Sequence, residues 1–401
     1  MLEELFYTHR LVTEDVPLKF KRYLYNEVDW QSPCVCISGA RGTGKTTLLL
    51  QHYHEQYGNV EQCLYLSADM IDVTALGLMN IAKTYFKYGG KALIIDEIHK
   101  YPAWQQELKN ILDLFKKKRV IFSGSSSVSL QRGKVDLSRR AVYYSLKGLS
   151  FREYLQLRLG KTLPAFSLEA VLSDHVKLAQ QVSKDIPVLK YFSEYLEKGY
   201  YPFFLEGEKG YLSKVLNVIE KVLYEDVVVT TGVRVSYVPV LKRLLWMIAT
   251  TVPFTINIEK LSRELGVAKA VVYAYLEYLS DAGLITLLRE DAVGLKIGRK
   301  PEKVLLENVN LLAAICGDLR VAQNKGTVRE TFLANQFTGR FKIHLAEKGD
   351  FVVDRKYTLE VGGKGKGLSQ LADNQQGYVA ADEIEIGFGR KIPLYLFGFM
   401  Y

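Results

Sequence analysis

The chain has 401 residues, of which 48% are hydrophobic and 24% charged. This balance excludes a disordered or fibrous chain, and the length exceeds what one hydrophobic core normally holds, so we expect two to four domains. The formal net charge of +9 permits an acidic or nucleic-acid partner without requiring one.

Cysteine usage and hydropathy predict a soluble, cytoplasmic protein. The four cysteines sit in apolar runs, which is typical of buried free thiols in a reducing compartment. The N-terminus is acidic and lacks the cationic segment of a signal peptide. The most apolar later stretch, residues 244–258, is interrupted by Pro253 and is too short to span a bilayer, so we expect no membrane partner.

Residues 1–30 are predicted to form an N-terminal arm, with a helix around residues 18–25 where apolar positions recur at helical spacing. Residues 31–148 are predicted to be an α/β core. After its first strand and helix, this core should continue with a strand over residues 62–68 and a helix over residues 73–88.

The first motif follows the apolar run of residues 34–38 and matches the G-x-x-x-x-G-K-[ST] phosphate loop. Glycines let successive backbone N–H groups turn inward around an anion, at a helix N-terminus whose dipole also favours negative charge. A chance match is the alternative, and the flanking strand and helix argue against it. The predicted nucleotide-binding residues are Gly39, Ala40, Arg41, Gly42, Thr43, Gly44, Lys45, Thr46 and Thr47.

Two residues of this loop have predicted roles in binding ATP and Mg²⁺. The Lys45 ammonium would reach the β- and γ-phosphates, and the Thr46 hydroxyl would sit on the Mg²⁺ ion. Thr47 adds a second hydroxyl to which the pattern assigns no role.

The second motif is the apolar run of residues 92–95, which ends in Asp96 and Glu97. Such a run is typical of a central parallel strand buried on both faces. Asp96 would support the Mg²⁺ ion, and Glu97 would polarise the water that attacks the γ-phosphate, which favours a hydrolase over a small-molecule kinase. Alternatively, the two carboxylates only cap the next helix, which Pro102 opens.

A further strand, predicted over residues 119–125, ends in small polar side chains. Ser123 or Ser125 would then reach between the carboxylates and the γ-phosphate. A serine-rich turn that caps a helix over residues 126–131 is an equal alternative. A lone histidine such as His99, close behind the carboxylates, is more often structural than catalytic.

The basic loop of residues 132–140 leads into a strand predicted over residues 141–146. Arg139 and Arg140 are candidates for an arginine finger on the γ-phosphate, a contact worth about 10³ to 10⁵ in rate. If the finger acts on a neighbouring subunit, the protein is a homo-oligomer. A solvated charged loop is the alternative.

These motifs together resemble those of the prokaryotic AAA+ superfamily ATPases that carry a C-terminal domain of unknown function. Besides the phosphate loop, the resemblance rests on Leu-Ile-Ile-Asp-Glu-Ile-His-Lys, Phe-Ser-Gly-Ser-Ser-Ser, Asp-Leu-Ser-Arg-Arg-Ala, Gly-Leu-Ser-Phe-Arg-Glu-Tyr, and residues 359–364 and 392–398. It implies an α/β fold: a P-loop AAA+ parallel-sheet core, a helical region, a winged helix-turn-helix and a small nuclease-like module.

Residues 149–235 would be the helical lid region, and residues 236–305 the winged helix. Within the latter, two predicted helices and a strand over residues 284–288 follow the helix-turn-helix order. The second helix carries no arginine that could contact base edges. DNA contact and a protein-packing role therefore both stay open. The basic residues of the expected wing, residues 294–303, are Lys296, Arg299, Lys300 and Lys303.

Residues 306–401 would resemble the PD-(D/E)xK nuclease fold, in which carboxylates of two neighbouring strands bind Mg²⁺ and a lysine positions water. The resemblance places Asp350 and Glu360 as the carboxylates, with Glu330 as a third ligand. The chain departs from the pattern because Gly362 occupies the lysine position, so the role would fall to Lys364. A degenerate fold that only binds is the alternative.

The sequence therefore predicts a Mg²⁺-dependent ATPase whose nucleotide state switches the C-terminal modules. The alternative is an ATP-regulated DNA-binding protein or nuclease whose output lies at the C-terminus. DNA or a protein partner would bind through these modules.

Overall fold

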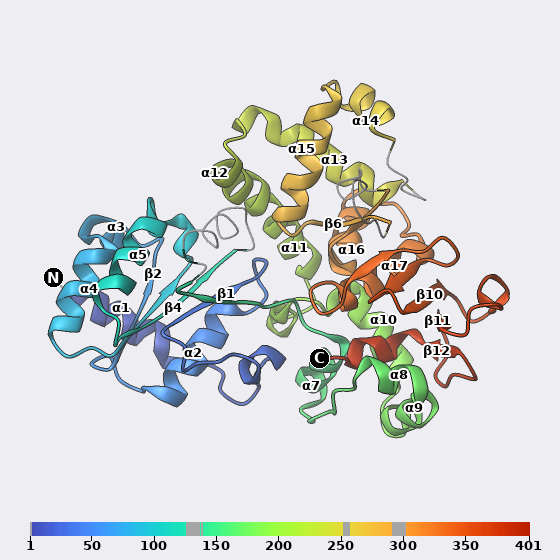
Figure 1. Cartoon of the computed structure of the whole chain (residues 1–401), viewed down its shortest axis with the longest axis horizontal. Helices are drawn as coiled ribbons and strands as arrows, with labels where there is room; N and C mark the ends of the chain where they lie inside the picture. The colour runs from blue at the N-terminus through green and yellow to red at the C-terminus, as the bar shows by residue number, and fades with distance from the viewer. Residues whose placement is uncertain (1, 126–136, 138, 252–256, 291–301) are drawn as a thin grey trace. The chain divides into compact units, whose positions relative to one another are not determined.

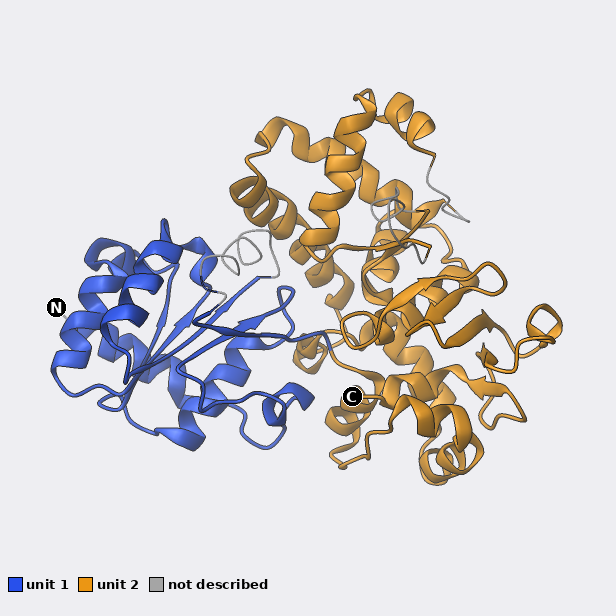
Figure 2. Ribbon diagram, in the orientation of Figure 1, with its two compact units in different colours: residues 1–148 blue, residues 149–401 orange. Residues whose placement is uncertain are grey.

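The computed structural model describes residues 2–125, 137, 139–251, 257–290 and 302–401. The chain divides into two compact units, Met1–Gly148 and Leu149–Tyr401 (Figure 2). Each unit buries its own set of apolar side chains. No helix among the described residues is long and apolar enough to cross a membrane.

The first unit is built on a parallel sheet with the strand order β2-β3-β4-β1-β5 (Figure 1). Because β1 pairs with β4 and β4 with β3, the carboxyl ends of these three strands meet at one edge of the sheet. The α/β class with a parallel-sheet core is thereby confirmed. The strands are β1 (Cys34–Ser38), β2 (Cys63–Ser67), β3 (Ala92–Asp96), β4 (Arg119–Gly124) and β5 (Val142–Ser145).

Helices cover both faces of this sheet. Helix α2 (Lys45–Gln56) packs its leucines on one face, while α4 (Leu78–Lys87) and α5 (Trp104–Leu114) bury apolar residues on the other. The single helix predicted over residues 73–88 is interrupted at Gly77, whose φ of 81° no helix accommodates, and α3 (Ile71–Leu76) precedes this break.

The N-terminal arm differs from the prediction. Its α-helix is α1 (Glu3–Glu14), and the segment predicted to be helical contains only a short 3₁₀ helix, Tyr23–Asn26. The physical reason is tertiary: the Gln51 side chain of α2 donates to the carbonyls of Pro17 and Phe20 at 2.6 and 2.8 Å. These hydrogen bonds hold the backbone around Pro17 and Phe20 in a non-helical conformation.

The second unit begins with α7 (Phe151–Leu159), which is capped at its N-terminus by Ser150 and Glu153 in a reciprocal pair of hydrogen bonds. The C-terminus returns to this helix, because the Tyr401 carbonyl accepts from Ser150 Oγ and Arg152 Nε, each at 2.8 Å. The helices that follow α7 are α8 (Leu168–Ser173), α9 (His175–Ser183), α10 (Val188–Lys198), α11 (Tyr211–Lys221), α12 (Val228–Thr231), α13 (Val238–Thr250), α14 (Ile258–Leu265), α15 (Lys269–Asp281), α16 (Val309–Asp318) and α17 (Lys325–Phe337).

Two sheets complete the second unit. Helices α14 and α15 are followed by an antiparallel pair of strands, β6 (Ile285–Leu288) and β7 (Lys303–Leu306). The larger sheet has the order β12-β11-β10-β9-β8, with β10, β11 and β12 parallel and β9 antiparallel to both of its neighbours. Its strands are β8 (Ile343–Leu345), β9 (Phe351–Val353), β10 (Tyr357–Gly362), β11 (Gly377–Ala381) and β12 (Lys391–Pro393).

Most of the expected wing falls outside the described residues, including Lys296, Arg299 and Lys300. Lys303 is described at the start of β7, where its Nζ lies 2.8 Å from Glu330 Oε2. The Lys303 charge is thus paired with a carboxylate of the same unit.

Candidate nucleotide site

The phosphate loop connects β1 to α2 in a conformation that requires glycine. Gly42 and Gly44 adopt φ values of 78° and 93°, which side chains rarely tolerate. A Cβ added at Gly39 would lie 2.3 Å from the Leu146 carbonyl oxygen, so the loop could not pass this point with a larger residue. The loop thus has the glycine-dependent turn and helix N-terminus that suit a phosphate.

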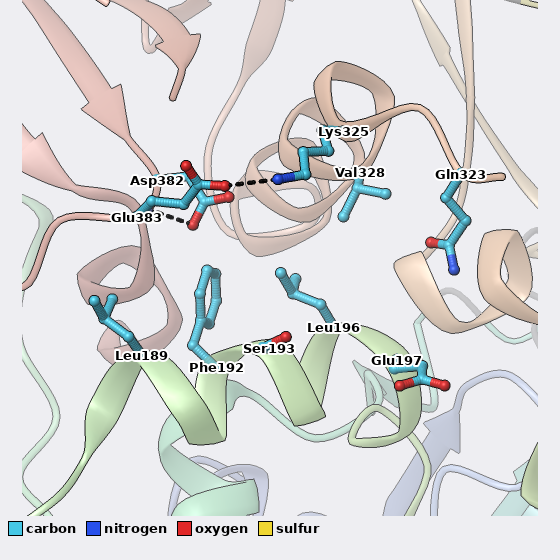
Figure 3. A pocket seen from close by; sticks show the side chains of 10 residues that line it. All are labelled: Leu189, Phe192, Ser193, Leu196, Glu197, Gln323, Lys325, Val328, Asp382 and Glu383. Atoms are coloured by element: carbon cyan, nitrogen blue, oxygen red, sulfur yellow. Dashed lines mark hydrogen bonds and ion pairs between the residues drawn. The ribbon is translucent and has the colours of Figure 1, made fainter. Parts of the chain in front are cut away.

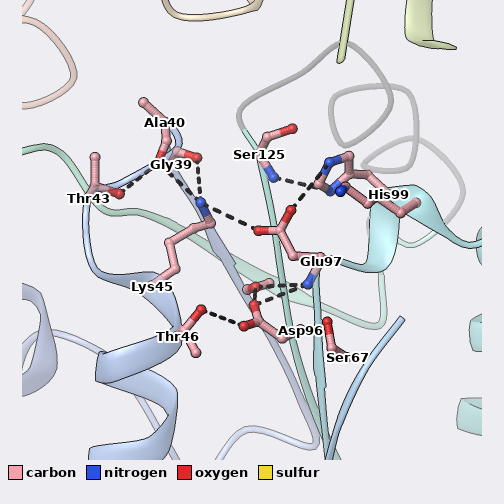
Figure 4. Close-up of polar contacts among 12 residues, drawn as sticks. Gly39, Ala40, Thr43, Lys45, Thr46, Ser67, Asp96, Glu97, His99 and Ser125 are labelled. Carbon is pink, nitrogen blue, oxygen red and sulfur yellow. Dashed lines mark hydrogen bonds and ion pairs between the residues drawn. The ribbon is translucent and has the colours of Figure 1, made fainter. Parts of the chain in front are cut away.

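Lys45 is folded back over this loop, with its side chain only 4% exposed. Its ammonium donates to the carbonyls of Gly39 and Ala40, each at 3.1 Å (Figure 4). Thr43 Oγ1 also donates to the Ala40 carbonyl, at 2.9 Å. Among the described residues, the hydrogen-bond acceptors of this buried ammonium are neutral carbonyls, which makes it well suited to an anionic ligand. Of the other predicted loop residues, Arg41 and Thr47 are partly exposed.

Asp96 lies at the carboxyl end of β3, 2% exposed and surrounded by hydroxyl groups. Thr46 Oγ1 donates to Asp96 Oδ2 at 2.5 Å, Tyr65 OH donates to the same oxygen at 3.1 Å, and Ser123 Oγ donates to Oδ1. Burial, together with the Asp96 carboxylate, holds the pKa of Tyr65 far above its usual value, so this phenol remains a donor. The structure therefore brings Thr46, Asp96 and Ser123 together at the end of β3.

Glu97 follows Asp96 in a left-handed conformation, with φ at 51°, and its side chain is 21% exposed. Its Oε1 lies 4.0 Å from Lys45 Nζ, and its Oε2 lies 3.6 Å from His99 Nε2 (Figure 4). The Ser125 backbone N–H donates to His99 Nδ1 at 3.3 Å. The carboxylate thus faces the phosphate loop, and the ends of β3 and β4 both contribute to the site.

The two candidate finger arginines are placed differently. Arg140 forms a two-point ion pair with Asp113 of α5, at 2.8 and 3.1 Å. Arg139 is exposed at the surface. Arg140 is therefore paired with a neighbouring helix of the same unit, whereas the Arg139 side chain faces solvent.

Arg22 is a residue of this site that the sequence did not predict. Its guanidinium, 5% exposed, donates to the Thr43 carbonyl at 2.5 Å and to the carbonyls of Lys147 and Gly148 at 2.7 and 2.8 Å. It thereby fixes the phosphate loop to the segment that follows β5. The arm has no local pattern that signals this role.

The second unit holds the carboxylates that were predicted as a nuclease-like site. Asp350 Oδ2 accepts from the Val361 backbone N–H at 2.7 Å, next to Glu360 on β10. Burial raises the pKa of Glu330, an effect that the Lys303 ammonium opposes and the neighbouring Asp350 carboxylate reinforces. Glu360 is 5% exposed, and its Oε2 has no hydrogen-bond partner in the described part of the chain.

The lysine beside Glu360 is Lys366, whose ammonium forms an ion pair with Glu360 Oε1. Lys364, the predicted residue, is exposed and contributes its backbone carbonyl as the acceptor for Lys391. In this structure the lysine in contact with Glu360 is therefore Lys366. Among the described residues, no group of three or more His, Cys, Asp or Glu side chains is placed to hold a metal ion.

A separate cavity of about 410 Å³ lies in the second unit between α10, the start of α17 and the segment after β11 (Figure 3). Its floor is apolar, with Phe192 and Leu196 of α10, and Asp382 and Glu383 stand at its side. These carboxylates already pair with Arg329 and Lys325, each at 2.9 Å, so the cavity presents no unmatched charge from them.

Comparison with known proteins agrees with the geometry of the first unit. Residues 31–155 match a family model described as an AAA domain, and residues 189–320 match a domain of unknown function (DUF8612). The phosphate loop and both carboxylates lie within the first match. Residues 31–155 are thus similar to an AAA domain, while the second match assigns no activity.

Two relatives come from Methanocaldococcus jannaschii. The uncharacterized protein MJ1637 is 26% identical over 93% of this chain and 78% of its own length. The uncharacterized protein MJ1544 is 24% identical over 63% of this chain and 55% of its own length. Neither name indicates an activity.

Solved structures give only distant likenesses. AMPPCP-bound DnaA from Aquifex aeolicus is 13% identical, with 70% of this chain and 88% of that chain covered, at a TM-score of 0.29. PCH-2 of C. elegans is also 13% identical, with 70% and 66% covered, at a TM-score of 0.23. At these scores the likenesses carry no argument, and the AAA domain rests on its sequence match and on the geometry of the site.

Proposed function

We propose that the protein binds ATP with Mg²⁺ and hydrolyses it at the carboxyl edge of the first unit's sheet. The observation that carries this proposal is the convergence of Lys45, Asp96 and Glu97 on the phosphate loop. Phosphoryl transfer to water uses hydrogen-bond donors for the phosphates, an acid that supports the metal and an acid that activates water, and the presence of these groups around one loop supports the proposal.

Each residue has a distinct role in this proposal. The loop amides and Lys45 bind the phosphates, and Thr46 and Asp96 would hold Mg²⁺, which would neutralise charge on the transferring phosphoryl group. Glu97 accepts the proton of the attacking water, and its partial exposure gives water access to it. Ser123 keeps Asp96 oriented by donating to the oxygen that Thr46 does not use.

Phosphate release tests this proposal. Wild-type protein should release phosphate from ATP in Mg²⁺ and stop when the metal is chelated, and Lys45→Ala should lose ATP affinity because the buried ammonium is gone. Lys364→Ala, which removes an exposed lysine of the other unit, is the matched control and should retain activity. Equal release by wild type and Lys45→Ala would refute the proposal.

A second candidate is an ATP-regulated nuclease or DNA-binding protein, with the C-terminal unit as its output. The convergence of Asp350, Glu360 and Lys366 favours it, whereas the lysine pairing of Glu330 and Glu360 favours a binding role over cleavage. Plasmid cleavage in Mg²⁺ that disappears in Asp350→Ala and Lys366→Ala, and persists in Lys364→Ala, would establish the nuclease. Retained cleavage in the first two variants would remove it.

We propose that the nucleotide state switches the second unit, which would bind DNA or a protein through its helix-turn-helix segment. The cysteines are buried and form no disulfide within the described part of the chain, which supports a cytoplasmic location. If Arg139 acts in trans within a homo-oligomer, turnover per subunit should rise with protein concentration and Arg139→Ala should abolish the rise. A flat profile would remove this idea.

A further inference from the structure

His99 lies directly after β3 in the 3₁₀ helix Ile98–Lys100, and its side chain is 3% exposed. Its ring contacts two elements of the site at once. Nδ1 accepts from the Ser125 N–H at the end of β4, and Nε2 faces Glu97 (Figure 4). The ring therefore connects the end of β4 to the carboxylate that β3 presents.

The contact with Ser125 determines which ring nitrogen carries the proton. A backbone N–H only donates, so Nδ1 must offer its lone pair, and the proton of the neutral ring then lies on Nε2. This N–H is directed to a carboxylate, which only accepts. The separation of 3.6 Å between Nε2 and Glu97 Oε2 is slightly longer than a hydrogen bond, and a small rotation of Glu97 closes it.

Glu97 needs such a partner because Lys45 cannot serve it throughout the reaction. In the proposed function Lys45 contacts the phosphates and so leaves Oε1, 4.0 Å away, without its cation. The left-handed backbone of Glu97 is also a conformation that the surroundings must maintain. The His99 ring, which accepts from the Ser125 N–H at the end of β4, faces the other carboxylate oxygen at 3.6 Å.

We infer that His99 is a positioning residue, which holds the Glu97 carboxylate in place through its Nε2–H while Lys45 engages the phosphates. This inference rests on the proposed ATPase function. The end of β4 would then position both carboxylates. Ser123 orients Asp96 directly, and the Ser125 backbone orients Glu97 through the histidine ring.

Two substitutions at His99 distinguish a positioning role of this residue from a merely structural one. His99→Phe retains the ring volume without the donor, and we expect kcat to fall about ten- to a hundredfold, the range for losing a hydrogen bond to a charged group, with KM changing less than about threefold. His99→Gln carries an amide acceptor and donor and should recover most of kcat. His52→Phe, at another buried histidine of the same unit, should retain wild-type kcat.

A double-mutant cycle makes the test specific for Glu97. In a Glu97→Gln background, His99→Phe should cause no further loss, because the group that it positions is gone. An unchanged kcat in His99→Phe would overturn the inference. So would an equal fractional loss in both backgrounds, or failure of His99→Gln to rescue.

Ring ¹⁵N NMR keeps this test separate from the ATPase proposal. We expect His99 as the Nε2–H tautomer at pH 7.5, with an Nε2 resonance that moves in Glu97→Gln and stays in the distant Asp113→Asn control. The Nδ1–H tautomer, or an unmoved resonance, would overturn the inference whether or not the protein hydrolyses ATP. A wild type that shows the expected NMR result but no turnover would refute only the proposed function.

Discussion

At the scale of single residues, Arg22 shows how strongly the site depends on contacts distant in sequence. Its guanidinium donates hydrogen bonds to carbonyls that lie 21, 125 and 126 residues away along the chain. Arginine suits this position because its planar fork offers five N–H donors, whereas a lysine ammonium could not reach three carbonyls in this geometry. Three segments, the arm, the phosphate loop and the strand exit, are thereby held together.

Arg22→Ala should destabilise the first unit by about 2 to 4 kcal/mol, because three buried carbonyls would lose a charged donor. Urea unfolding, monitored by tryptophan fluorescence, checks this loss of stability. In a Trp246→Phe background the fluorescence comes from Trp30 and Trp104 alone, and both lie in the first unit. Arg140→Ala, which removes only a surface pair with Asp113, should leave the midpoint nearly unchanged. Equal midpoints for both variants would contradict the role given to Arg22.

At the scale of elements, the sequence predicted the strands and the phosphate loop well, because buried apolar runs and glycine spacing are local signals. The carboxylates of β3 could be placed for the same reason. The sequence did not predict helix α1 or the contacts of Arg22 and Lys366. These depend on tertiary interactions, which leave no local pattern in the sequence. Lys366, which contacts Glu360, lies two residues beyond Lys364, the lysine that the sequence predicted.

Helices α1 and α2 carry buried histidines that make the first unit sensitive to acid. Burial lowers the pKa of both His9 and His52 to about 4, whereas a free histidine titrates near 6.5. Between these values the unfolded chain binds more protons than the folded chain. The stability is therefore complete above about pH 6.5 and falls as the pH drops toward 4, by at most about 2 kcal/mol for His52 at pH 5.

His52→Phe should reduce this acid sensitivity, because the phenyl ring can stack on Trp30 as the imidazole does and takes up no proton. Denaturant midpoints at pH 7 and pH 5 give the comparison, and the difference between them should be smaller in the variant than in wild type. An identical or larger difference would show that His52 is not a source of the pH dependence.

At the scale of the whole molecule, the chain joins a segment that matches an AAA domain to a second unit that has its own mixed sheet and the helices α14 and α15. A nucleotide can switch the second unit only if it binds two states of the protein with different affinity. The proposed switch therefore makes a prediction about a part of the chain that is remote in sequence from the phosphate loop.

Hydrogen exchange with ATP and with ADP tests this coupling. In a hydrolysis-deficient Glu97→Gln protein, ATP should change exchange in helices α14 and α15 of the second unit, and the change should be absent in Lys45→Ala, which cannot bind. Changes confined to the first unit would mean that the nucleotide does not switch the second unit.

The central claim is that Glu97 activates water at a site where Lys45 binds ATP, and one experiment with radiolabelled ATP tests it directly. Bound and hydrolysed nucleotide are measured in the same single-turnover sample for wild type, Glu97→Gln and Lys45→Ala. We predict that Glu97→Gln binds ATP as wild type does but hydrolyses it about 10² to 10⁴ times more slowly, the usual contribution of a general base, while Lys45→Ala does neither. Hydrolysis at the wild-type rate by Glu97→Gln would contradict the account.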